Sequence, residues 1–126
     1  MIYRKAPNQG PFDGEPRRSW GTIARYTEIG DDLYALRHVD VFTNGYTLRY
    51  DRTHWVDGFG MLADMRYDVK KWENWWGPAI AIDPAEFEAV WQAATSSPTW
   101  SEQVGCAQMA ELGAVPIWLQ LRAGRA

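Results

Sequence analysis

The dipeptide Asn44-Gly45 constrains the fold of this chain more than any other feature of its sequence. It lies between residues 33–43 and 46–53, two runs in which β-branched, aromatic and polar residues alternate. Asn-Gly is the preferred pair for a two-residue type I′ hairpin turn, because both central residues of that turn need a positive φ. The sequence therefore predicts an antiparallel hairpin over residues 33–53, central in a small sheet.

A two-residue turn also predicts which hairpin residues lie opposite one another. One face of the hairpin is then apolar and the other is charged, as is typical of a half-buried antiparallel pair. The expected apolar pairs are Val39–Tyr50 and Val41–Leu48, and the expected polar pairs are His38–Asp51 and Asp40–Arg49.

Two helices are expected after the sheet. Asp83 is a favourable N-cap, Pro84 suits the first helical position, and apolar residues then recur at helical spacing. A second capping pattern that begins at Thr99 predicts another helix. The expected fold is α+β, a small antiparallel sheet packed with helices at 84–95 and about 100–112, in a single domain of residues 1–126.

Other parts of the chain give weaker signals. Proline and glycine punctuate residues 1–20, which predicts an irregular segment with at most a short strand near residues 2–4. A strand is expected over 22–29, where β-branched and aromatic residues precede a Gly-Asp-Asp turn. Residues 54–82 leave a loop, a strand and a helical turn near 70–76 as open alternatives.

Composition excludes several classes of protein. Thirteen basic and 16 acidic side chains give a net charge of −3, which argues against a nucleic-acid partner. One cysteine excludes a disulfide framework and a multi-cysteine zinc cage, and two histidines leave little room for another metal centre, so we expect no metal and no cofactor. No apolar run approaches the roughly 20 residues of a membrane span, and the first residues lack a signal-peptide pattern. A cytoplasmic protein that does not bind membranes is expected.

Eight tryptophans in 126 residues are the unusual part of the composition. Trp72, Trp75 and Trp76 fall on one side if residues 70–76 form a helical turn. Such a cluster either covers the core of a small domain or forms a binding hot spot, since tryptophan offers a large contact area with few rotatable bonds. A tryptophan platform also suits a small ligand or a glycan.

The charge distribution favours a protein partner for this cluster. Residues 53–112 carry nine acidic and three basic side chains, although the whole chain is close to neutral. An aromatic patch with acidic neighbours would attract a basic binding surface on a partner, whereas the alternative is an ordinary solvated acidic surface. The candidate partner-binding residues are Trp72, Trp75, Trp76, Asp64, Asp68 and Glu73.

Catalysis has one candidate pair. His38 and Asp51 lie opposite each other in the expected hairpin, and a histidine oriented by a carboxylate can act as a general base. Cross-strand ion pairs on a solvated sheet face are the competing interpretation, because such pairs are common. We therefore assign no catalytic residue from sequence, and a small enzyme that uses His38 and Asp51 stays an alternative.

The order of several motifs resembles a small, uncharacterised bacterial domain family. The motifs are Tyr26-Thr27-Glu28-Ile29, the run Leu36-Arg37-His38-Val39-Asp40-Val41-Phe42 before Asn44-Gly45, and Ile82-Asp83-Pro84-Ala85-Glu86-Phe87. Members of this kind resemble the immunity proteins encoded beside bacterial polymorphic toxins. The resemblance implies a non-catalytic inhibitor that binds and neutralises a cognate toxin. The alternatives are a small-ligand or glycan-binding module and the small enzyme described above.

Overall fold

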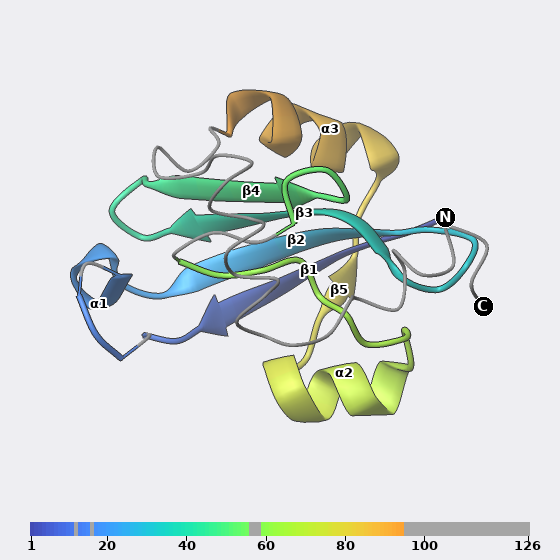
Figure 1. Cartoon of the computed structure of the whole chain (residues 1–126), viewed down its shortest axis with the longest axis horizontal. Coiled ribbons are helices and arrows are strands. Elements are labelled where there is room, and N and C mark those ends of the chain that lie inside the picture. Colours follow the sequence, from blue (N-terminus) through green and yellow to red (C-terminus); the bar gives the residue numbers. More distant parts are fainter. Residues whose placement is uncertain (12, 16, 56–58, 95–126) are drawn as a thin grey trace.

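The computed structural model describes residues 1–11, 13–15, 17–55 and 59–94. These residues form five strands and three helices (Figure 1). In chain order the elements are β1 (Ile2–Gln9), α1 (Arg17–Trp20), β2 (Ile23–Ile29), β3 (Ala35–Phe42), β4 (Thr47–Asp51), α2 (Val69–Trp76), β5 (Ile80–Ala81) and α3 (Pro84–Ala93).

The strands form one antiparallel sheet in the order β4-β3-β2-β1-β5. The predicted α+β class is therefore confirmed, and α3 confirms the helix expected at 84–95. The hairpin of β3 and β4 makes up one end of the sheet rather than its centre, with β4 at the edge. The expected helix at about 100–112 lies outside the described residues.

Strand β1 is longer than the sequence indicates. It pairs with β2 along its length and with β5 at Arg4 and Lys5, although it contains Pro7. The register against β2 shifts between Ala6 and Gln9, at the place where Pro7 lies. Proline has no N–H to donate, so an irregularity in the ladder is where a strand tolerates it.

The predicted register of the hairpin is wrong by one residue. Phe42 N donates to Tyr46 O and Gly45 N donates to Phe42 O, so the loop has three residues instead of two. Gly45 has a φ of 92°, whereas Asn44 does not have a positive φ. This is the pattern of a three-residue hairpin loop whose last residue lies in the left-handed region.

The register shift changes the two faces of the hairpin. His38 lies opposite Tyr50, and Asp40 lies opposite Leu48, so all four side chains share one face and are buried. The expected pairs His38–Asp51 and Asp40–Arg49 do not form, because Asp51 lies opposite Arg37 and Arg49 lies opposite Val39. A one-residue slip moves every side chain of one strand to the other face relative to its partner.

The two main helices cover opposite faces of the sheet (Figure 1). We call these the α2 face and the α3 face. On the α3 face, Phe87 is fully buried and its ring lies 5.6 Å from that of Tyr3. Trp91 is half-buried, and the centre of its ring lies 4.8 Å from the Cζ of Arg49.

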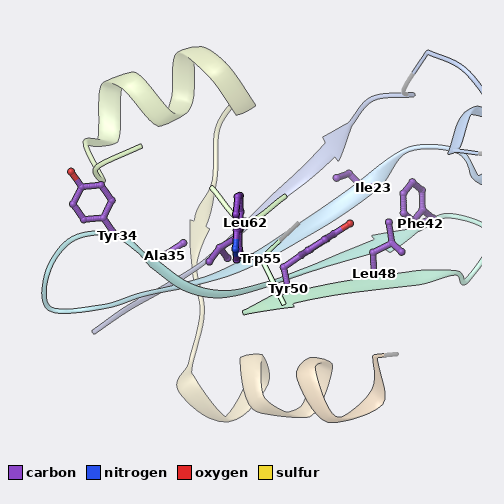
Figure 2. Packing of buried hydrophobic residues seen from close by; sticks show 8 residues of the cluster. All are labelled: Ile23, Tyr34, Ala35, Phe42, Leu48, Tyr50, Trp55 and Leu62. Atoms are coloured by element: carbon purple, nitrogen blue, oxygen red, sulfur yellow. The ribbon is translucent and has the colours of Figure 1, made fainter. Parts of the chain in front are cut away.

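The main apolar core lies on the α2 face (Figure 2). Trp55 and Leu62 approach from the segment that follows β4, and Leu62 N donates to Trp55 O at 2.7 Å. Trp55 and Leu62 pack with residues of β2, β3 and β4, whereas Trp72 and Trp76 of α2 lie beside residues of β1 and β2. The core residues are Ile23, Tyr34, Ala35, Phe42, Leu48, Tyr50, Trp55 and Leu62.

Candidate functional site

Helix α2 carries the three clustered tryptophans, and local capping determines its limits. Asp68 is the N-cap and accepts a hydrogen bond from Lys71 N at 3.1 Å. Gly77 ends the helix with a φ of 76°, and its N–H donates to Glu73 O. A positive φ favours glycine at this position, because glycine has no Cβ to strain there. The helical turn anticipated near 70–76 is thus part of α2.

The three tryptophans of α2 have different environments. Trp72 is 2% exposed, and its indole Nε1 donates to Arg66 O at 3.1 Å. Trp76 is half-buried and meets Trp72 edge-on, with ring centroids 4.8 Å apart. Trp75 is 73% exposed. Trp72 therefore attaches the helix to the sheet, whereas Trp75 and Trp76 reach the surface.

Trp75 and Trp76 border a hollow of about 390 Å³, which we call the outer hollow. Its other walls are Arg25 and the segment of residues 61–65. Asp64 belongs to this wall, so the structure brings one of the predicted acidic residues beside two of the predicted tryptophans. Met61, at the same hollow, is 37% exposed.

The other two predicted acidic residues lie elsewhere. Asp68 is the N-cap of α2, and Glu73 borders a separate hollow of about 120 Å³ together with Tyr67, Val69 and Ile80. Exposed Lys70 and Lys71 share the helix with these acids. The charges of α2 therefore balance locally.

A smaller space, which we call the inner pocket, lies between α2 and the sheet. The side chains that line it include Arg4, Arg25, Thr27, Ala63, Trp72 and Trp76. Arg25, Ala63 and Trp76 also border the outer hollow, so the two spaces share a wall. Sequence reasoning missed Arg4 and Arg25, because nothing local indicates that two arginines on different strands lie on one face.

Arg4 is buried between aromatic rings, with 6% of its surface exposed. Its Cζ lies 5.2 Å from the ring centre of Trp72 and 5.5 Å from that of Tyr67. Its Nη1 has no hydrogen-bond partner in the described part of the chain. Burial lowers the pKa of Arg4 below its usual value, although Tyr67 and Glu73 partly offset that effect.

Arg25, by contrast, has a carboxylate partner. Its Nε and one Nη donate to the two oxygens of Asp40 at 2.8 and 3.2 Å. His38 Nε2 lies 3.5 Å from the same carboxylate. Burial by itself raises the pKa of Asp40, but the charges of Arg25 and His38 outweigh it and hold that pKa well below the usual range. Asp40 is therefore a buried anion that accepts two hydrogen bonds from Arg25 and lies beside His38.

The catalytic pair considered from sequence does not exist in this arrangement. His38 points to the α2 face, and Asp51 belongs to the opposite side of β4, opposite Arg37. His38 instead lies beside Asp40, and its ring is tilted by 44° against that of Tyr50, with the two ring centroids 4.8 Å apart. A general base that depends on Asp51 is thus excluded by the register.

The residues that the structure describes contain neither a metal-type cluster nor a membrane-spanning helix. Among them, no group of three or more His, Cys, Asp or Glu side chains has the arrangement of a metal site. No helix in the same residues is long and apolar enough to cross a membrane. Comparison of the chain with protein-family models, with curated proteins and with solved structures gives no match.

Proposed function

We propose that this chain is an immunity-type protein that binds a cognate bacterial toxin and neutralises it without catalysis. The contact centres on the rim of the outer hollow, which Trp75, Trp76 and Met61 form. One observation carries the proposal, namely that Trp75 keeps 73% of its surface exposed at the mouth of a hollow. Exposed aromatic anchors next to recesses are the usual energetic centres of protein interfaces.

The neighbouring side chains extend this surface. Met61 is exposed, and Met65 lines the hollow beside it. Methionine adapts its shape to an incoming side chain because it is unbranched and flexible. Lysines and acids on α2 balance in charge, so the affinity at the rim comes from apolar contact. The net negative charge of residues 53–112 would act only by attracting a basic partner from a distance.

The choice of a toxin as the partner comes from the sequence resemblance to immunity proteins. A stable complex buries about 800 Å² on each partner, which is more than the hollow alone provides. The interface therefore extends beyond the rim, and Trp75 is its central anchor.

The test is co-purification with the protein encoded by the adjacent gene, followed by measurement of the affinity by calorimetry. We expect Trp75→Ala to weaken the complex by about tenfold or more, since truncation of a hot-spot aromatic costs over about 1–2 kcal/mol. Protection of cells that express the neighbouring protein should fall in parallel.

Ile80→Ala is the matched control. Ile80 is 60% exposed but borders the separate hollow with Glu73, so its loss removes apolar surface away from the rim. We expect less than about a threefold change, as for most contacts outside a hot spot. Absence of any complex at micromolar concentration would refute the proposal, and equal losses in both variants would place the anchor elsewhere.

A further inference from the structure

The guanidinium of Arg4 is buried on the α2 face, and it forms no salt bridge among the residues that the structure describes. Arg25, two strand positions away across the β1–β2 ladder, is neutralised by both oxygens of Asp40. Within the described residues, no carboxylate oxygen lies within 4 Å of Arg4, and its Nη1 is buried without an acceptor.

Such a group is costly to bury. An arginine stays protonated in proteins, so a buried guanidinium cannot escape the cost by losing its proton. Cation–π contacts with Trp72 and Tyr67, and a side-chain hydrogen bond with Tyr67, offset part of that cost, but Nη1 has no acceptor among the described residues. An anion at Nη1 would supply the missing acceptor, and its charge would reinforce the favourable electrostatic effect of Glu73 on Arg4.

The shape of the site restricts that anion. The inner pocket has room for about one water-sized group, with a volume of about 10 Å³. The outer hollow beside it holds about 390 Å³, and the two share Arg25, Ala63 and Trp76. A single oxygen therefore fits at Arg4, while the rest of the molecule must occupy the outer hollow.

The geometry points to a carboxylate-binding site. We propose that one oxygen of an aliphatic carboxylate enters the inner pocket and accepts a hydrogen bond from Arg4 Nη1, while its carbon chain lies against Trp76 in the outer hollow. Asp64, on the hollow's wall, disfavours a negative charge at the mouth, which places the charged end of the ligand at Arg4.

A free small carboxylic acid and a glutamate side chain of a protein partner share this chemistry. The second source would make Arg4 the receptor for one partner residue, and that version rests on the proposed function. The first source is independent of it. The site itself is testable on the isolated chain, so failure here leaves toxin binding untouched.

The experiment follows the indole N–H signals of ¹⁵N-labelled protein during titration at constant ionic strength. The probes are sodium butyrate, neutral butyramide, and a tripeptide with one central glutamate and blocked ends. We expect butyrate or the peptide to shift the Trp72 and Trp76 signals saturably, while butyramide has no effect at the same concentration. Tighter binding of one of the two carboxylates identifies the source.

Arg4→Gln should weaken carboxylate binding by about tenfold or more, since it removes a charge-assisted hydrogen bond. Lys5→Gln is the matched control, because it removes the same charge one residue along β1, on the other face of the sheet. We expect no change in affinity for this variant.

Equal shifts with butyrate and butyramide, or no shift with any probe, would overturn the proposal and assign the inner pocket to water. Because that comparison uses the unaltered protein, it decides the question even if Arg4→Gln fails to fold. Unchanged butyrate binding in a folded Arg4→Gln protein would also overturn it.

Discussion

Asp40 is the carboxylate that Arg25 and His38 share in the interior of the α2 face. It is 5% exposed and receives two hydrogen bonds from Arg25. We predict that Asp40→Asn destabilises the fold by about 3–5 kcal/mol, because removal of one partner leaves a buried guanidinium without its counter-ion. Urea denaturation of both proteins at pH 7 measures the difference. A loss below about 1 kcal/mol would contradict the importance of the pair.

The same carboxylate predicts a pH dependence. Burial alone raises the pKa of Asp40, but Arg25 and His38 hold it below the usual range, so the folded state binds a proton less readily than the unfolded chain. The stabilisation is fully present above the unfolded value of about 4 and is lost as pH falls below it. Asp40→Asn should flatten the loss of stability below pH 4. Asp31→Asn is the control for the loss of one carboxylate, because the Asp31 side chain is 93% exposed and its 3.5 Å contact with the N-terminal ammonium is at the surface.

At the scale of elements, the hairpin loop has three residues, although its Asn44-Gly45 dipeptide also suits a two-residue type I′ turn. Gly45 has a φ of 92°, and no atom lies within 4 Å of the Cβ that alanine would add. We predict that Gly45→Ala costs about 1–2 kcal/mol from backbone strain alone. Asn44→Gly should also destabilise, because Asn44 has no positive φ and its side chain accepts from Tyr46 N. A type I′ turn would require a positive φ at position 44, which glycine adopts without strain, so unchanged or increased stability in urea denaturation would contradict the three-residue loop.

The loop also explains which part of the fold was predictable. Asn-Gly between two alternating runs identifies the hairpin, but it suits both loop lengths, since glycine supplies the left-handed residue in each. The choice between them depends on contacts outside the hairpin, such as Thr43 N donating to Thr22 O. A one-residue error then reassigns His38 and Asp40 from the surface to the interior.

In the candidate site, too, the local sequence predicts the helix, whereas contacts between distant residues determine the pocket. Periodicity places Trp72, Trp75 and Trp76 on one helical turn, and the structure has that helix. Their exposure ranges from 2% for Trp72 to 73% for Trp75, and this depends on which side of α2 meets the sheet. Arg4 of β1 shares a pocket with Trp72 of α2, which lies 68 residues later in the sequence, and no local pattern encodes that proximity.

At the scale of the whole molecule, the sheet is a single layer with a helix on each face, and each face has its own polar network. On the α3 face, Arg37 binds Glu28 and also Glu88 of α3, which links that helix to the sheet by charge. On the α2 face, the corresponding link is Trp72, through its contacts with Arg4 and with Arg66 O. The two helices are therefore attached by different chemistry.

Two tryptophans of α2 have different roles: Trp72 attaches the helix to the sheet, and Trp75 is the proposed contact with a partner. Trp72→Ala should destabilise the fold by about 3–5 kcal/mol, because it empties a buried aromatic position and exposes the charged face beneath. Trp75→Ala, on the same helix, should change the free energy of unfolding by less than about 0.5 kcal/mol, since Trp75 is 73% exposed. Urea denaturation monitored by circular dichroism compares them directly.

Hydrogen exchange adds the regional readout, because amides of α2 should lose protection in Trp72→Ala more than amides of α3 do. A large loss of stability in Trp75→Ala would show that this indole supports the fold, and its exposure would then no longer argue for a binding role. Unchanged stability in Trp75→Ala together with a weakened partner complex would instead show that Trp75 serves binding. Trp72, less than one turn away on the same helix, would then serve folding.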